Sequence, residues 1–343
     1  MPVTIYDIAE SAEVSIATVS RVLNRHPRVS DTTRRRVFEV ASRLGYEPHA
    51  SAQSLARKNT QLISAVVPMM TSAFFMEVLR GVQDRLDGSD YDLLVYASRT
   101  MDRVDGQLAR AVQRGRSDGL LLVSTPLSED RADALASSDQ PVVLVDASHP
   151  GLDSVTVDNR RGGATATQHL IERGHRRIGL LLPVEGSGPA CQRRLGYLDA
   201  MEAAGLPVDE RLIVTADWDH DHHGYTRFAG YRAMQTLLSR VSGDERPSAV
   251  FAAADVMALG ALRAAREVGM ATPDALEVVG FDDIEPSAYA GLTTLRQPMA
   301  AMGRLATELL LRRFESPDAP PRQVVFAPEL IVRETTGTVG EVA

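Results

Sequence analysis

From residue 62 onward, short apolar runs alternate with longer amphipathic stretches, and this alternation constrains the fold most. Strands that alternate with helices form parallel sheets, which are covered on both faces because each crossover places a helix there. We expect strands at 62–67, 93–95, 119–123, 142–145, 178–182, 249–251 and 278–280, with a last one near 329–333. The helical stretches are 75–86, 161–173, 194–204, 225–238 and 257–268. A region of this length needs two such α/β units, and ligands of open α/β sheets bind at the carboxyl ends of the strands.

The first sixty residues differ from this body in charge. They hold nine basic and six acidic residues, a net charge of +3, whereas the whole chain of 343 residues carries −8 and the remainder therefore −11. A basic head on an acidic body suggests that nucleic acid is contacted through the head alone. An excess of this size also fits an ordinary solvated face, so the inference needs a motif.

The head reads as short helices with recognisable starts. Thr4 and Asp7 are spaced close to a capping box, Ser15 is a good N-cap for a helix over about 16–24, and Ser30 caps a helix over 31–44. On a helical wheel, the second helix has an apolar side and a polar side. The apolar side holds Val19, Val22 and Leu23, and the polar side holds Ala17, Ser20, Arg21 and Asn24, with Ile16 at its edge.

This division suits a helix that buries one side on its own domain and offers the other to base edges in the major groove. Arg21 can donate two hydrogen bonds to a guanine, while Ile16 and Ala17 can contact thymine methyl groups. Other polar side chains have the length and polarity for phosphate oxygens. These are Thr4, Tyr6, Ser15, Thr18, Ser20 and Asn24.

The same residues carry a resemblance to a known family. The strings Thr4-Ile5-Tyr6-Asp7-Ile8-Ala9, Val14-Ser15-Ile16-Ala17-Thr18-Val19-Ser20-Arg21-Val22-Leu23-Asn24, Val29-Ser30, Thr33-Arg34 and Leu44-Gly45-Tyr46-Glu47-Pro48 look like the DNA-binding domain of the lactose repressor (LacI/GalR) family. The resemblance implies a helix-turn-helix DNA-binding domain at 1–48, with Arg28 and Thr33 among the DNA contacts. The alternative is a helical bundle without a DNA function.

In that family, a hinge helix forms after the proline when two chains meet on DNA, and its leucine wedges into the minor groove. The matching segment is 49–59, in which Leu55 would be the wedge and Ala52 its small neighbour. Leu55 could instead pack against the core. His49 departs from the asparagine common there, which leaves the start of the hinge in doubt.

The body also resembles the core of this family, which is similar to periplasmic sugar-binding proteins. The resemblance implies an effector-binding and dimerisation core at 60–335 and a tail at 336–343. Lobe 1 would comprise 60–158 and 297–322, and lobe 2 would comprise 159–295 and 323–335. Supporting strings are Phe74-Phe75, Asp158-Asn159, Gly174-His175-Arg176-Arg177-Ile178, Arg193-Arg194-Leu195-Gly196-Tyr197, Met257-Ala258-Leu259-Gly260, Gly280-Phe281-Asp282-Asp283, Thr293-Thr294 and Gln297-Pro298.

Within the resemblance, several positions match effector contacts. Arg193 and Asp282 would form a central pair that hydrogen-bonds vicinal hydroxyls or a comparable polar group. The other matching or cleft-facing residues are Ser124 and Asp146 at strand ends, Gln297 at a lobe crossover, and Trp218, Phe74 and Phe75 as stacking surfaces.

Each of these residues also has a plainer interpretation. Asp282 could cap the following turn, Arg193 could form an interlobe salt bridge, and one of the two phenylalanines could pack in the lobe core. Trp218 lies among acidic residues and histidines, but their spacing fits a solvated loop better than a metal site.

One departure from the family pattern affects the effector. Many sugar-responsive members have Asn-Asp before the Met-Ala-x-Gly string, whereas this chain has Ala254-Asp255. One amide contact to the ligand is therefore missing. A sugar remains the leading expectation, with a less hydroxylated effector as the alternative.

Other classes of protein fit the sequence less well. No phosphate loop, zinc-protease motif or nucleophile elbow occurs, and Lys58 is the only lysine, so we expect neither an enzyme nor a cofactor or metal. A transport solute-binding protein would have no use for the head.

The sequence also bears on where the protein acts. The N-terminus does not resemble a secretion signal, no apolar run could span a membrane, and Cys191 is the only cysteine, so a cytoplasmic protein is expected. No heptad helix follows the last strand, which favours a homodimer on an inverted repeat.

Overall fold

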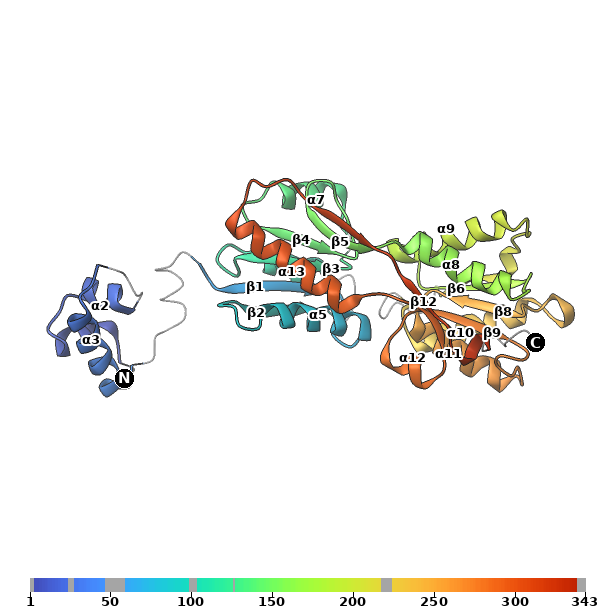
Figure 1. Cartoon of the computed structure of the whole chain (residues 1–343), viewed down its shortest axis with the longest axis horizontal. Coiled ribbons are helices and arrows are strands. Elements are labelled where there is room, and N and C mark those ends of the chain that lie inside the picture. Colours follow the sequence, from blue (N-terminus) through green and yellow to red (C-terminus); the bar gives the residue numbers. More distant parts are fainter. Residues whose placement is uncertain are drawn as a thin grey trace, which may run out of the picture. The chain divides into compact units, whose positions relative to one another are not determined.

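The computed structural model describes residues 3–23, 28–46, 59–98, 104–125, 127–216 and 224–337. These residues fall into two compact units, one within Met1–Leu62 and Arg114–Asp118 and the other within Ile63–Gln113 and Gly119–Ala343. The first unit contains the helical head. The second contains an α/β core with two sheets (Figure 1).

The head consists of α1 (Ile5–Ser11), α2 (Ile16–Leu23) and α3 (Asp31–Leu44). Their apolar faces meet in one small core of Ile8, Ala9, Ala12, Val19, Val22, Val37, Val40 and Ala41. The Ser30 hydroxyl accepts a hydrogen bond from the Thr33 amide and so caps α3, which ends at Gly45 in the left-handed conformation. The expected starts at Ser15 and Ser30 are confirmed.

The first sheet of the core has the strand order β11-β5-β4-β3-β1-β2, and the strands from β11 to β1 pair in parallel. Its strands are β1 (Leu62–Val67), β2 (Asp92–Ala97), β3 (Gly119–Val123), β4 (Val142–Val145), β5 (Asp153–Val157) and β11 (Gln323–Phe326). Helices α5 (Ala73–Leu86) and α13 (Met299–Glu315) pack on one face, and α6 (Val104–Ala111) and α7 (Glu129–Ala136) pack on the other. We call this layered unit the first lobe.

The second sheet has the order β12-β10-β9-β8-β6-β7, with antiparallel pairing only at β12 among the pairs described. Its strands are β6 (Ile178–Leu182), β7 (Ile213–Thr215), β8 (Ala249–Ala252), β9 (Glu277–Asp282), β10 (Thr293–Arg296) and β12 (Glu329–Ile331). Helices α8 (Asn159–Glu172) and α9 (Gly188–Ala203) cover one face, and α10 (Arg227–Arg240) and α11 (Asp255–Glu267) cover the other. The short α12 (Glu285–Tyr289) follows β9. This is the second lobe.

Two of the expected lobe boundaries are wrong. Residues 323–335 were expected in lobe 2, but β11 pairs with β5, so Gln323–Phe326 belongs to the first lobe and the chain crosses after Phe326. Thr336 was expected in the tail, yet its buried hydroxyl bonds His169 and Thr293 of the second lobe. The expected strands omitted β5, β7, β10 and β11.

Glycines allow three helix pairs to pack with their backbones in contact. Adding a Cβ to Gly163 of α8 would overlap the backbone of Arg193 in α9, and a Cβ on Gly196 of α9 would overlap the backbone of Arg160 in α8. The pairs α5–α13 and α10–α11 use Gly81, Gly303, Gly230 and Gly260 in the same reciprocal way. The α8–α9 contact therefore fixes the position of the Arg193 backbone.

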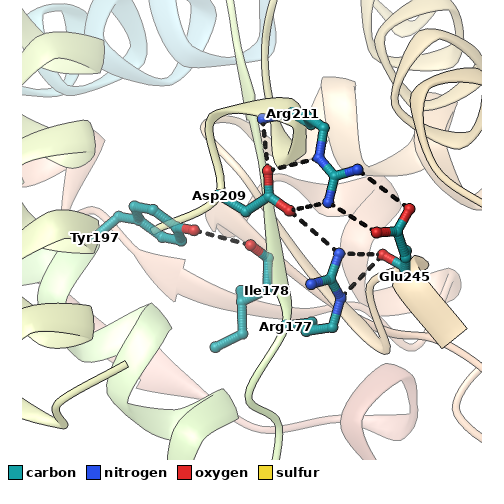
Figure 2. Close-up of polar contacts among 6 residues, drawn as sticks. All are labelled: Arg177, Ile178, Tyr197, Asp209, Arg211 and Glu245. Carbon is teal, nitrogen blue, oxygen red and sulfur yellow. Dashed lines mark hydrogen bonds and ion pairs between the residues drawn. The ribbon is translucent and has the colours of Figure 1, made fainter. Parts of the chain in front are cut away.

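A charged network ties the loops at the amino end of the second sheet (Figure 2). The Asp209 carboxylate accepts hydrogen bonds from the Arg211 guanidinium at 2.9 and 3.0 Å, and Arg211 also pairs with Glu245 at 3.1 Å. Arg177 lies within 3.3 Å of Asp209. Tyr197 donates from its hydroxyl to the Ile178 carbonyl at the base of β6.

We expect Asp209→Asn to lower the free energy of unfolding by about 1 kcal/mol at pH 7, because the network is partly solvated. Hydrogen bonds from Arg211 lower the pKa of Asp209 from 3.8 to about 2. Since the folded-state pKa is depressed, this stabilisation is present above pH 4 and is lost as the pH falls towards 2. Urea unfolding at pH 7 and at pH 2.5 should therefore show a difference between the proteins that shrinks with acid. A difference that grows on acidification would contradict this account.

Candidate functional site

Helix α2 has the two-sided surface that the wheel predicts. Val19 and Val22 are fully buried in the head core, and Leu23 packs against it. Ala17 and Arg21 are exposed, and Ile16 keeps 40% of its surface accessible. The expected division is confirmed, so the outer face of α2 is available to a partner.

The expected phosphate-contacting residues gather at helix starts. The Ser15 hydroxyl accepts from the Thr18 amide at 3.2 Å and lies 2.9 Å from the Thr18 hydroxyl. Thr4 donates from its amide and hydroxyl to Asp7, both at 2.7 Å, and these bonds lower the pKa of Asp7. Tyr6 is largely exposed.

Other members of the expected DNA-contacting set can be placed in part. Thr33 is half-buried beside its cap, Arg28 is exposed and Ser20 is half-buried. Asn24, Ala52, Leu55 and the hinge segment 49–59, apart from its last residue, lie outside the described residues.

The core holds a cavity of about 730 Å³, lined by residues of both lobes. Among the effector-contacting residues expected from the sequence, all those that the structure describes line it: Phe74, Phe75, Ser124, Asp146, Arg193, Asp282 and Gln297. Trp218 lies outside the described residues. Ser124, Asp146 and Gln297 directly follow β3, β4 and β10, and Asp282 is the last residue of β9, as the topology of parallel sheets predicts. Arg193 lies within α9.

Arg193 is held in place at the cavity by several contacts. It is 3% exposed and donates to Asn159 Oδ1 at 2.8 Å and to the Ala253 carbonyl at 2.5 Å. Its guanidinium carbon lies 3.7 Å from the centre of the Phe281 ring, and Nη1 lies 3.9 Å from Asp282 Oδ1. The guanidinium plane is thereby fixed before any ligand arrives, which lowers the entropic cost of binding.

Three other polar residues that line the cavity have an unusual backbone conformation. Ser124, Asp146 and Asp282 have φ values of 43°, 60° and 124°, in a region that non-glycine residues rarely adopt. Ser124 donates to Asp146 at 2.6 Å, and Gln297 donates to Asp282 at 2.6 Å. Backbone strain of this kind is concentrated at ligand sites, where it aims side chains inward.

Burial governs the electrostatics of these carboxyl groups. It raises the pKa of Asp146 and of Asp282, although the nearby Arg193 works in the opposite direction. Asp255, fully buried at the start of α11, raises the pKa of Asp282 further by charge repulsion. Burial also raises the pKa of Tyr225 to about 12, and the Tyr225 hydroxyl lies 2.7 Å from that of Ser187.

The alternatives left open for these residues have structural outcomes. Phe75 packs in the core of the first lobe and Phe74 is half-buried edge-on to it at 5.3 Å, yet both line the cavity. Arg193 and Asp282 both belong to the second lobe, so their pair is not an interlobe salt bridge.

Sequence reasoning missed several lining residues, among them Asn159, Tyr225 and His149. Asn159 follows β5, a strand that was not expected. Recognising that strand would have placed Asn159 at a carboxyl end.

An exposed helix-turn-helix face and an α/β cavity with fixed polar groups define a class of protein: ligand-responsive DNA-binding regulators. Comparisons with known proteins agree. Residues 4–49 match the model of bacterial regulatory proteins of the lacI family, and residues 167–336 match a periplasmic binding protein-like domain. Both matches lie where the head and the core do.

Individual relatives cover nearly the whole chain. Catabolite control protein A of Priestia megaterium is 34% identical over 91% of this chain and 92% of its own, and the ribose operon repressor of Haemophilus influenzae is 33% identical over 97% and 98%. The lac repressor dimer bound to operator and the anti-inducer ONPF superposes with a TM-score of 0.83 at 28% identity, covering 98% of this chain and all of that one. A CelR–cellobiose complex has a TM-score of 0.69 at 31% identity, covering 97% and 99%.

The chain therefore belongs to the lacI family of bacterial transcription regulators, and it is a DNA-binding repressor with an effector-binding core rather than an enzyme. Relatives bind operator DNA as dimers and bind sugar effectors. Within the described part of the chain, every helix is too short or too polar to cross a bilayer.

Proposed function

We propose that this repressor binds an inverted-repeat operator as a homodimer and that a sugar or sugar derivative in the core cavity controls its affinity for that operator. Ile16, Ala17 and Arg21 read base edges, and the polar residues at the starts of α1 and α2 contact phosphates. Leu55 and Ala52 of the hinge segment contact the minor groove. As DNA binding requires, the protein acts in the cytoplasm.

The observation that carries the effector assignment is the convergence of fixed polar groups on one cavity. These groups include both hydrogen-bond donors and acceptors, which suits vicinal hydroxyl groups because each hydroxyl can donate and accept. They belong to Arg193, Asp282, Asp146, Ser124 and Gln297. The aromatic rings of Phe74 and Phe75 offer an apolar wall for the face of a sugar ring.

One experiment tests both halves of this proposal. Duplexes selected by the protein from a randomised pool would define the operator, and a panel of sugars would then be screened for thermal stabilisation and for a change in operator affinity. We expect selected duplexes to contain two half-sites, and at least one sugar both to raise the melting temperature and to change the affinity. Selection of a single half-site would overturn the homodimer on an inverted repeat. Stabilisation by no sugar would overturn the sugar effector.

Arg21→Ala is expected to weaken operator binding about tenfold to a hundredfold and to relax specificity at one position of each half-site, because a bidentate arginine–guanine contact is lost. Affinities measured by fluorescence anisotropy on the selected duplex and its single-base variants would check this. Arg43→Ala is the matched control, since Arg43 is exposed on a different helix, in the last turn of α3. Equal losses in the two variants would show a general charge effect and refute base reading by Arg21.

A further inference from the structure

Two buried acceptors in the cavity have no hydrogen-bond partner. Asp146 Oδ1 and Gln297 Oε1 are both buried without one, and both residues line the cavity. Gln297 is 3% exposed, and its amide nitrogen is already used by Asp282. Because buried acceptors are almost always paired in proteins, these two oxygens call for hydrogen-bond donors on a ligand.

The charged side chains around the cavity also favour a ligand that brings a positive charge. Among the described lining residues, the acidic side chains are Glu129, Asp146 and Asp282, and Arg193 is the one permanently positive side chain. His149 also lines it, with Nε2 3.3 Å from Asp133 outside the cavity. Acidic side chains therefore outnumber permanently positive ones around the cavity.

Two donor groups of Arg193 are already engaged by acceptors other than these carboxyls. Its Nε and Nη1 donate to Asn159 and to the Ala253 carbonyl, and it lies 3.9 Å from Asp282, beyond hydrogen-bond distance. Asp255 is buried next to the cavity but does not line it. Its carboxylate accepts hydrogen bonds from the Ile284 amide and from the hydroxyls of Ser287 and Thr294, and none of these contacts is with a cation. Burial raises the pKa of Asp146 and of Asp282, and a cation placed beside these carboxyls would favour their ionised forms.

We propose that this cavity selects an effector that brings hydrogen-bond donors and a positive charge, namely an amino sugar, over the matching neutral sugar, and that it rejects sugar phosphates and sugar acids. An ammonium group supplies three donors and the missing charge at once. A neutral sugar can donate hydrogen bonds to these acceptors, but it brings no positive charge to the carboxyl groups of Asp146 and Asp282. An anionic sugar would add a like charge beside buried carboxylates, where repulsion is strong.

This inference rests on the proposed function, because it assumes that the ligand is a sugar. The test is a calorimetric titration of the full chain with matched sets: glucose, galactose and mannose, each with its 2-amino derivative, its 6-phosphate and its uronic acid. For the sugar configuration that binds, we expect the amino derivative to bind about tenfold more tightly than its parent, and the anionic derivatives to show no binding.

Asp146→Asn removes one negative charge with little change of shape. The preference for the amino sugar should then fall severalfold. Asp130→Asn, an equal change at an exposed residue of α7 outside the cavity, should keep the wild-type preference.

The outcomes separate the two proposals. If no sugar in the panel binds, the sugar class in the proposed function fails, and the charge selection fails with it. If sugars bind but a phosphate or uronic acid binds as tightly as the amino derivative, the charge selection alone is overturned. The charge selection is also overturned if the wild-type protein binds the unmodified sugar as tightly as its amino derivative.

Discussion

Gly196→Ala is expected to destabilise the core by about 3 kcal/mol and to impair effector binding at the same time. The added methyl group would lie 2.5 Å from the Ala164 amide nitrogen and would overlap the Arg160 carbonyl. Both neighbours are helix backbone, which cannot move aside as a flexible side chain can. Helices α8 and α9 must therefore separate, and α9 carries Arg193 away from Asn159.

Thermal and urea unfolding of the full chain would measure the loss, and sugar titration would measure the binding defect. Gly106→Ala is the matched control, because Gly106 lies in α6 with open space where its Cβ would be. That substitution should raise stability by about 0.5–1 kcal/mol, since glycine is costly inside a helix. A melting temperature for Gly196→Ala equal to that of the wild type would refute the close packing of α8 on α9.

The strands that the sequence predicted well are those buried on both faces. β1, β3, β4 and β6 were expected with the bounds the structure has, because both sides of each strand contact helices and the residues read as continuous apolar runs. For such strands, the local sequence is enough to predict where the strand begins and ends.

Two of the missed strands, β5 and β10, contain polar residues that distant parts of the chain satisfy. In β5, buried Asp153 pairs with Arg313 at 2.5 Å and accepts from the Arg322 amide at 2.6 Å. In β10, Thr294 donates to Asp255 and Thr293 bonds Thr336. These partners lie far away in sequence, so the local pattern reads as a loop.

The candidate site divides in the same way. Ser124 and Asp146 could be placed at the carboxyl edge of the first sheet, because each follows an apolar strand and the carboxyl ends of parallel strands meet. Asp282 could be placed at the carboxyl edge of the second sheet for the same reason. The setting of Arg193 could not be predicted. Its contact with Asn159 depends on the close approach of α8 and α9. Its contacts with the Ala253 carbonyl and the Phe281 ring depend on the packing of α9 against the second sheet, and no residue pattern near Arg193 reports either arrangement.

Arg193→Ala is expected to weaken effector binding at least a hundredfold and so to abolish the effector's influence on operator affinity. Removing a buried, hydrogen-bonded charge costs about 2–5 kcal/mol in binding, much of it because its partners are left unpaired. The variant would also lose the donor to Asn159 Oδ1 and to the Ala253 carbonyl, and Asp282 would lose the positive charge 3.9 Å away, so the cavity wall would be less well ordered. Without Arg193, which lowers the pKa of Asp282 against the effect of burial, that pKa should rise further.

Calorimetry with the sugar that binds the wild type, and operator binding with and without it, would measure both effects. Arg194→Ala makes the same chemical change one residue later, at a partly exposed side chain that lies 3.7 Å from Glu210, and it should respond like the wild type. The head should still bind operator in both variants, because its core of Ile8, Val19 and Val37 does not involve either arginine. Retained sugar response in Arg193→Ala would show that the guanidinium does not contact the effector, and equal loss in both variants would point to α9 as a whole.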